Sequence, residues 1–413
     1  MAVHDAHHAH GPFAMLRLLA LFLLGLLLTA PLAHADAGFD RFLRSEAWPA
    51  AKREGVSRRT FDAAVRGLTP DRSLPGLGEV TKGPNYQAEF KSPSRYFRGA
   101  SQLAGTGRKL AKRHASTLAS IERRYGVPGR ILLAIWARES AYGNAAIPHD
   151  AVRVLATRAY LDRRREFYTR EFVAALKIIQ RGDISRSAMR SSWAGAMGQP
   201  QFMPTSFLEH AVDFDGDGRR DIWNSVPDTL ASIANYLKNY GWERGRDWGY
   251  EAAVPASVSC SLEGPDGMRP FRDWASAGVT RASGSALPEK EMRKKGSLLM
   301  PAGREGPAFV ATPNFYAIKK YNNSDLYALF VGNLADRIQF GSGDFRRGWG
   351  GATGLTRGQV RSMQRVLIGQ GHDVGGADGL AGFKTRRSIG KWQRGAGMGE
   401  TCWPNRSLAA RLG

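Results

Sequence analysis

Residues 126–144 read GVPGRILLAIWARESAYGN, and they place one acidic side chain on an otherwise apolar helix. A proline near the start and a glycine near the end predict a helix over 128–142. Leu132, Trp136 and Glu139 follow the spacing i, i+4, i+7, so they share one face of that helix. The stretch therefore sets a carboxyl group beside a tryptophan at the edge of a hydrophobic core.

Glu139 is the first candidate for chemistry. Partial removal from water disfavours the charged form of a carboxyl group, which raises its pKa and keeps it protonated near neutral pH. Those are the requirements of a general acid. The alternative is that Glu139 simply pairs with Arg138 or with another arginine.

The helical pattern continues on both sides of this segment, with apolar residues at three- and four-residue steps. The predicted helices span 108–125, 128–142, 151–161, 165–181, 203–211 and 228–240. Residues 245–320 hold more Gly, Pro, Ser and aromatic residues and predict short strands. Regular alternation of strands and helices is missing, which argues against a parallel sheet. We therefore expect one mainly α domain over 36–340.

A glycine-rich segment follows this domain. Residues 341–354, GSGDFRRGWGGATG, contain six glycines and predict a linker. The remaining residues, 355–413, are sufficient for one small helical module.

Composition excludes several function classes. Lys and Arg number 59 against 37 Asp and Glu, giving a formal charge of +22. No G-x-x-x-x-G-K-[ST] loop and no G-x-G-x-x-G fingerprint after a strand occurs, which argues against nucleotide chemistry. No C-x-x-C pair occurs either, which excludes a cysteine-type zinc module. Cys260 and Cys402 fall in different predicted domains, so we expect free thiols. No cofactor is expected for chemistry.

Residues 1–35 predict an export signal. The apolar run 18–30 follows Arg17, and Ala33 and Ala35 occupy the −3 and −1 positions of a cleavage site. A membrane anchor is the alternative, but thirteen apolar residues are short for a bilayer core of about 30 Å. We therefore expect an exported protein of the bacterial periplasm or cell envelope, without a stable membrane anchor. There the basic charge meets acidic polymers or anionic lipid surfaces; general solubility is the alternative explanation.

Two further segments combine small, amide-bearing and aromatic residues. Residues 191–206, SSWAGAMGQPQFMPTS, set Gln199 and Gln201 beside apolar surface, which suits the uncharged rings of a sugar polymer. A tight packing turn is the alternative. Residues 314–338 cluster tyrosines and amides at Tyr321, Asn322, Ser324 and Tyr327. Core packing at a helix start is the alternative there.

Residues 213–228, DFDGDGRRDIWNSVPD, match the first half of a calcium loop. Position 12 of the loop is Asn224 instead of the usual glutamate. The predicted ligands of a structural Ca²⁺ are Asp213, Asp215, Asp217, the carbonyl of Arg219, Asp221 and Asp228. The alternative is a turn whose carboxylates are neutralised by the two adjacent arginines.

Taken in this order, the segments resemble the lytic murein transglycosylase B family of the lysozyme superfamily. The resemblance runs from about Phe39 to Gln339 and rests on YGVPGRILLAIWARESAYG, AGAMGQPQFMPTS, VDFDGDGRRDIW, SIANYLKNYGW and NFYAIKKYN. It implies an α+β lysozyme-like catalytic domain with an EF-hand-like loop. It also implies cleavage of the β-1,4 bond between N-acetylmuramic acid and N-acetylglucosamine in peptidoglycan. The sugar's own 6-hydroxyl would replace water and leave a 1,6-anhydromuramic acid end.

The resemblance assigns roles residue by residue. Glu139 falls on the family's catalytic glutamate, which acts first as an acid and then as a base. The implied substrate-binding residues are Ser192, Met197, Gln201, Phe202, Tyr236, Tyr321, Asn322 and Tyr327. The spacing to Asp228 is one residue longer than in the family, a departure that concerns the metal rather than the fold.

Residues 354–400 resemble the small three-helix peptidoglycan-binding domain, with its Asp378-Gly379 and Trp392-Gln393 pairs. The resemblance implies a wall-anchoring module that raises the local substrate concentration. The expected partners are peptidoglycan strands and other cell-wall enzymes. We do not expect binding to nucleic acid. Two alternatives remain: a muramidase of the same fold that hydrolyses with water, and a catalytically silent murein-binding scaffold.

Overall fold

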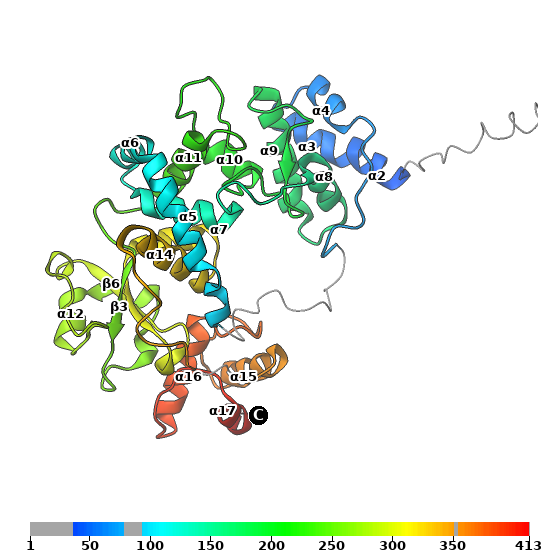
Figure 1. Ribbon diagram of the computed structural model, residues 1–413. Coiled ribbons are helices and arrows are strands. Elements are labelled where there is room, and N and C mark those ends of the chain that lie inside the picture. Colours follow the sequence, from blue (N-terminus) through cyan, green and yellow to red (C-terminus); the bar gives the residue numbers. More distant parts are fainter. Residues whose placement is uncertain (1–35, 78–92, 351–353, 413) are drawn as a thin grey trace, which may run out of the picture.

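The computed structural model describes residues 36–77, 93–350 and 354–412 (Figure 1). The predicted export signal over 1–35 lies outside these residues. Within them, no helix combines the length and the apolar character needed to span a bilayer. The described chain is mainly helical, as the sequence predicted, with one five-stranded and one two-stranded antiparallel sheet.

Most helices lie upstream of residue 340, and all of them except the short helix Phe271–Ser276 contribute to one large hydrophobic core. They are α2 (Ala37–Phe42), α3 (Trp48–Arg53), α4 (Arg58–Val65), α5 (Ala100–Arg113), α6 (Ala115–Tyr125), α7 (Gly129–Ser140), α8 (Ala151–Leu161), α9 (Arg165–Arg181), α10 (Pro204–His210), α11 (Val226–Asn239), α12 (Phe271–Ser276), α13 (Pro313–Tyr321) and α14 (Asp325–Phe340). A π-helical turn, η1 (Leu43–Ala47), joins α2 to α3, and the 3₁₀ turns include η3 (Pro93–Phe97), η4 (Cys260–Leu262) and η5 (Pro265–Gly267).

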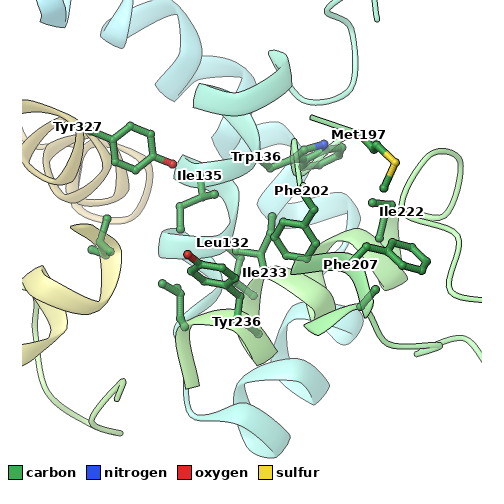
Figure 2. Packing of buried hydrophobic residues seen from close by; sticks show 14 of the residues in the cluster. Leu132, Ile135, Trp136, Met197, Phe202, Phe207, Ile222, Ile233, Tyr236 and Tyr327 are labelled. Atoms are coloured by element: carbon green, nitrogen blue, oxygen red, sulfur yellow. The ribbon is translucent and has the colours of Figure 1, made fainter. Parts of the chain in front are cut away.

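Helix α7 lies at the centre of the upstream domain. Every residue from Ile131 to Ala137 is buried, because α7 packs against α5, α6, α11 and α14 on different sides. A helix that is apolar all round is stable only when other elements enclose it. Figure 2 shows Leu132, Ile135 and Trp136 of α7 within this packing. The residues at the end of α7 are thereby held on a rigid support.

A second group of helices packs beside the first. Helices α8 and α9 lie against each other, and α9 also contacts α3, α4 and α10 (Figure 1). The short strands β1 (His149–Asp150) and β2 (Arg190–Ser191) pair in an antiparallel manner at the start of α8. This pairing fixes where the segment 191–206 leaves the helical core.

The predicted strands over 245–320 are present as one antiparallel sheet. Its strands are β3 (Gly249–Ala253), β4 (Arg269–Pro270), β5 (Thr280–Arg281), β6 (Lys295–Leu299) and β7 (Ala308–Ala311), in the spatial order β4-β6-β7-β3-β5. The sheet covers its own small core, which includes Phe271, Trp274 and Val310. Helix α13 follows β7 and returns the chain to the helical domain.

The C-terminal residues form the expected three-helix bundle. Its helices are α15 (Arg357–Gly369), α16 (Phe383–Gly395) and α17 (Arg406–Leu412), and they enclose a separate core that includes Val360, Leu367, Ile389 and Leu408. Figure 1 shows the bundle beneath the sheet and the helical domain. The described residues of the preceding glycine-rich segment are not free of the domain, since Phe345 and Trp349 pack on Phe97 with ring centroids 5.5 and 5.1 Å away.

Five of the six predicted helices agree with the structure to within two residues at each end. The prediction of one helix over 108–125 is wrong, because His114 has a non-helical backbone and separates α5 from α6. The two helices bury different surfaces. Helix α5 packs on α14, whereas α6 packs on α11, and a straight helix could not reach both.

The prediction of free thiols is also wrong. Cys260 and Cys402 form a disulfide although 142 residues separate them in the sequence. The bundle docks with α16 directly against η4, where an added Cβ at Gly390 would lie 2.3 Å from the sulfur of Cys402. A residue without a side chain is therefore required at this contact. Composition alone gave no sign that the two domains meet here.

Candidate active site

Glu139 lies in the last turn of α7 and remains partly exposed at the edge of the core. The hydroxyl of Tyr327, on α14, donates a hydrogen bond to Glu139 Oε1 at 2.5 Å. Burial raises the pKa of Glu139 to about 7, even though the hydrogen bond from Tyr327 and the charge of Arg138 act in the opposite direction. The carboxyl group is thus half protonated near neutral pH and can both give and accept a proton.

Arg138, the nearest arginine in the sequence, does not neutralise this carboxyl group through an ion pair. Its guanidinium carbon lies 4.3 Å from the ring centroid of Tyr96 and 5.1 Å from that of Phe330. The salt bridges among the described residues do not include Glu139. The alternative in which Glu139 is simply an ion-pair partner therefore does not describe the structure.

An aromatic wall continues from Tyr327 through Tyr321 to Tyr236 and Phe202. The rings of Tyr327 and Tyr321 stack with centroids 6.3 Å apart, and Tyr321 lies 4.8 Å from Tyr236 and 5.9 Å from Phe202. Figure 2 shows Tyr236 and Phe202 side by side and the hydroxyl of Tyr327 pointing from α14 toward α7. These residues come from three segments predicted separately, and the fold brings them together.

Hydrogen bonds fix the orientation of the wall. Tyr236 donates to the carbonyl of Lys320 at 2.7 Å, and Tyr321 donates to the carbonyl of Pro200 at 2.8 Å. Burial raises the pKa of Tyr236 and of Tyr321, and the nearby charge of Glu139 raises both further. The phenols are therefore neutral at physiological pH and offer uncharged polar and apolar surface.

The segment 191–206 folds as a compact loop beside α7. Met197 is fully buried and pairs through its backbone with Phe202, with N···O distances of 2.7 and 3.0 Å. Ser192 accepts a hydrogen bond from the amide of Ala196 at 3.2 Å, while Gln201 adopts a left-handed backbone with φ of 52°. The loop thus places Phe202 in the wall, whereas Met197 supports it from behind.

Two grooves begin at the neighbours of Glu139. Ser140 lines one, of about 740 Å³, together with Gly143, Gln199 and Trp223. Arg138 lines the other, of about 770 Å³, which also contains the exposed Asn322 and parts of the C-terminal bundle. A polymer chain passing along both grooves would lie beside Glu139. Asn322 therefore belongs to the surroundings of the site rather than to the aromatic wall.

Comparison with known proteins decides the family. A family model described as the transglycosylase SLT domain matches residues 38–336. The chain belongs to this family. Among curated proteins, it is 28% identical over 310 residues to the membrane-bound lytic murein transglycosylase B of Escherichia coli strain K12, covering 73% of this chain and 79% of that protein.

Solved structures of transglycosylases give similar results. The chain is 40% identical to SltB3 from Pseudomonas aeruginosa in complex with NAG-anhNAM-pentapeptide, with a TM-score of 0.80 over 91% of this chain and 99% of that one. It is 25% identical to the Escherichia coli lytic transglycosylase Slt35 in complex with calcium, with a TM-score of 0.59 over 74% of this chain and 92% of that one. The match to SltB3 includes more of this chain than the upstream domain alone.

In this transglycosylase, Gln199 braces the site in a way that sequence reasoning missed. Its Oε1 accepts a hydrogen bond from Trp136 Nε1 at 2.8 Å, and its Nε2 donates to the carbonyl of Trp223 at 2.9 Å. Gln199 therefore ties the loop 191–206 to α7 on one side and to the acidic loop on the other. The only signal in the sequence is a long amide among small residues, which we interpreted as a sugar contact.

The acidic loop of the transglycosylase brings together three of its six predicted metal ligands. Carboxylate oxygens of Asp213, Asp215 and Asp217 lie within 4.8 Å of one another. Arg219 pairs with Asp217 at 3.2 Å on the surface, and Arg220 instead binds Asp183. The arginines thus neutralise one of the three carboxylates at most.

Asp228 and Asp221 have other roles in this loop. Asp228 is fully buried and accepts hydrogen bonds from the amides of Phe214, Asp215 and Asp221, which occupy both of its oxygens. Asp221 accepts from the amides of Trp223 and Asn224, both at 2.9 Å. The structure therefore uses these two carboxylates to shape the loop and does not bring them into the cluster.

Proposed function

We propose that this chain is a lytic transglycosylase that cleaves the β-1,4 bond between N-acetylmuramic acid and N-acetylglucosamine in peptidoglycan. The product would carry a 1,6-anhydromuramic acid end. The observation that carries the proposal is the carboxyl group of Glu139, whose pKa is raised by burial to about 7 and whose chain neighbours Arg138 and Ser140 each line a groove. Membership of the transglycosylase SLT domain family supports the reaction class.

One carboxyl group is sufficient for this chemistry. Most glycosidases require a pair of carboxylates, and substrate-assisted enzymes are the exception. Among the described residues, the groups that shift the pKa of Glu139 are Tyr327 and Arg138, and neither is a carboxylate. A second acid acting in concert with Glu139 would be expected to perturb its pKa.

The proposed reaction has two proton transfers at Glu139. The protonated carboxyl group first gives its proton to the glycosidic oxygen as the bond from that oxygen to C1 breaks. The 2-acetamido group of the sugar stabilises the cation developing at C1. The carboxylate then removes the proton of the 6-hydroxyl as its oxygen bonds to C1, which restores protonated Glu139 without consuming water.

The place of action follows from two independent features. The sequence of residues 1–35 has the pattern of an export signal. The disulfide between Cys260 and Cys402 supports the same compartment, because disulfides persist in oxidising environments such as the bacterial periplasm. We therefore assign the protein to the periplasm or cell envelope, with peptidoglycan strands as the partner of both the grooves and the C-terminal bundle.

A structural Ca²⁺ in the acidic loop is part of the proposal. The three clustered carboxylates are hard oxygen donors of the kind that calcium prefers, and the carbonyl of Arg219 would add a fourth oxygen. The structure of the Slt35 relative in complex with calcium supports this assignment. The ion would stiffen the loop that adjoins Gln199 and would take no part in proton transfer. Calorimetric titration with Ca²⁺, followed by a chelator, tests the site; an absence of binding heat and of any thermal stabilisation would remove it.

Mass analysis of the soluble products from purified sacculi tests the proposed reaction. The protein without residues 1–35 should release fragments one water lighter than hydrolytic ones and lacking a reducing end. Glu139→Gln should release none, whereas Glu122→Gln, which changes an exposed glutamate on α6, should behave as the unaltered protein. Products with reducing ends would instead identify a muramidase. Binding without release would identify a murein scaffold.

A further inference from the structure

A buried arginine of the C-terminal bundle reaches the helix that carries Tyr327. Arg386, on α16, is 1% exposed. Its Nε and Nη2 donate to the two carboxylate oxygens of Glu263 at 2.8 and 2.9 Å, and Nη2 also donates to Asp325 Oδ2 at 3.3 Å. One guanidinium therefore joins the bundle, the sheet and the first residue of α14.

Glu263 fixes the sheet end of this contact. It follows η4, is fully buried, and also accepts a hydrogen bond from the amide of Met300 at 3.1 Å. Burial alone would lower the pKa of Arg386, but the carboxylates of Glu263 and Asp325 outweigh burial and raise it. The guanidinium is thus permanently charged and is held from two sides.

Asp325 forms the other end of the contact and lies two residues before Tyr327. Lys319 binds its second oxygen at 2.7 Å. Burial opposes ionisation of this carboxyl group, yet Lys319 and Arg386 lower its pKa below the ordinary value. Ser324 caps the same turn by accepting a hydrogen bond from the amide of Tyr327. The first turn of α14 is therefore clamped immediately beside the residue that binds Glu139.

Stability alone does not account for such an arrangement. Burying a guanidinium and two carboxylates costs solvation energy that hydrophobic packing would avoid. The same interface already contains the disulfide and a second ion pair, in which Arg387 of α16 binds Asp266 of η5. What the buried contact adds is a fixed position for the start of α14.

We propose that Arg386 is a positioning residue for the active site, acting through Asp325 to hold the hydroxyl of Tyr327 on Glu139. This inference rests on the proposed function and deepens it. The C-terminal bundle then belongs to the catalytic unit, in addition to any role in binding the cell wall. Loss of the bundle would lower turnover at the bond itself, even with short soluble substrates that need no anchoring.

The test compares Arg386→Met with Arg387→Met, a matched control on the same helix. The second change breaks an ion pair to the same domain but has no link to α14. We expect Arg386→Met to lower kcat about tenfold with KM changed less than about twofold, as small losses of geometry do. The pH at which activity falls on the alkaline side should also rise by about half a unit. The hydrogen bond from Tyr327 stabilises charged Glu139, so a weaker bond raises the pKa of Glu139. Arg387→Met should change none of these quantities.

A second variant guards against a failure to fold. Arg386→Met leaves Glu263 buried without its partner, so Arg386→Met/Glu263→Gln replaces the pair by neutral groups of similar size and keeps Asp325 bound to Lys319. Hydrogen exchange of the amides of 325–328 should be faster in either variant that folds, while α7 remains protected. Hydrogen exchange does not depend on catalysis, so it tests the positioning role of Arg386 independently of the proposed function.

The outcomes are distinguishable. An inactive parent protein would remove the proposed function, and the exchange data would still decide whether Arg386 holds the turn. An active parent whose alkaline limb and α14 exchange are both unchanged in the double variant would overturn the positioning role. So would equal effects of Arg386→Met and Arg387→Met, since both would then report docking of the bundle only.

Discussion

Glu139 and Asp325 both lie next to Tyr327, one in space and one in the sequence, and the structure shifts their pKa values in opposite directions. Tyr327 binds Glu139 through its hydroxyl, while Asp325 begins the helical turn that carries Tyr327. Burial raises the pKa of Glu139 to about 7. Burial acts in the same sense on Asp325, but Lys319 and Arg386 lower its pKa instead.

The difference teaches that burial alone does not determine the function of a carboxyl group. In a chain with 59 basic and 37 acidic residues, a cation is available for almost any carboxylate. Asp325 pairs with two cations and stays negatively charged at the start of a helix, where the helix dipole favours a negative charge. Glu139 has none in an ion pair, because Arg138 is placed on aromatic rings. The absence of a direct cation keeps Glu139 able to exchange its proton.

The largest expected effect is on turnover when Glu139 loses that ability. Glu139→Gln should lower the initial rate on sacculi by more than about 1000-fold, since one group serves as both acid and base. Circular dichroism should show an unchanged fold. A residual rate above one tenth of the parent rate would mean that another group transfers the proton. Glu139 would then not differ from Asp325 by serving as the acid and base.

Removal of the disulfide tests whether the bundle that supplies Arg386 needs a covalent tie. Because 142 residues separate the cysteines, Cys260→Ala/Cys402→Ala should lower the free energy of unfolding by about 4 kcal/mol. Thermal unfolding with and without a reducing agent measures this. Reduction should lower the thermal midpoint of the parent to that of the double variant and should leave the midpoint of the double variant unchanged. If reduction left the midpoint of the parent unaltered, noncovalent docking of the bundle would be sufficient.

Asp325→Asn should behave in the opposite way to Glu139→Gln. Removal of one member of a buried ion pair costs about 3 kcal/mol, because Arg386 and Lys319 keep their charges without that partner. We expect a lower thermal midpoint and a loss of rate of about tenfold, as for Arg386→Met, against the more than about 1000-fold loss expected for Glu139→Gln. Asp273→Asn is the matched control, since Asp273 forms an exposed pair with Arg272, and its effect should be below about 1 kcal/mol. Equal midpoints for the two variants would contradict a clamp at Asp325.

Tyr327 binds Glu139 and lies in the helical turn that Asp325 begins. Replacement by phenylalanine removes its hydroxyl and keeps its ring. Tyr327→Phe should lower turnover about tenfold and move the alkaline limb of the rate profile up by about half a unit, because the lost hydrogen bond stabilises ionised Glu139. Tyr250→Phe is a suitable control, since the Tyr250 hydroxyl is buried in the sheet region without a hydrogen-bond partner in the described structure. A downward shift of the limb would mean that Tyr327 favours the protonated acid.

The sequence predicted most of the helices and the desolvated setting of Glu139, because both depend on local spacing. Helices α8 and α9 match the predicted bounds, and the apolar face of α7 correctly indicated a desolvated carboxyl group. The break at His114 was not predicted, since it depends on which neighbour each half of the helix meets.

Contacts between distant segments were beyond sequence reasoning. The Cys260–Cys402 bond and the contact from Arg386 to Asp325 both require the bundle to dock on the domain. The glycine-rich composition of 341–354 predicted a linker but gave no sign that Phe345 and Trp349 pack on the core. Gln199 was recognised as an amide near the site, but its role as a brace depends on Trp136 and Trp223, which lie in other segments.

The smallest expected effect is the pH dependence of stability, and it has opposite signs for the two carboxyl groups. The pKa of Glu139 is about 7 in the folded protein against an ordinary value of 4.5, so the folded state holds the proton more tightly and loses stability as pH rises from about 4.5 to 7. Glu139→Gln should not lose stability in this way, because glutamine does not titrate. Its thermal midpoint should match that of the parent at pH 4 and exceed it at pH 8 by an amount equivalent to about 1 kcal/mol, since Glu139 is partly exposed.

Asp325 should show the reverse in the same titration. Its pKa is lowered in the folded protein, so its contribution to stability is present above the ordinary value of 3.8 and disappears as pH falls through the folded value. Asp325→Asn should therefore lie well below the parent at pH 8 and approach it below pH 4. If both variants shifted in the same direction at pH 8, burial alone would govern the two carboxyl groups, and the cations around Asp325 would not be what distinguishes it from Glu139.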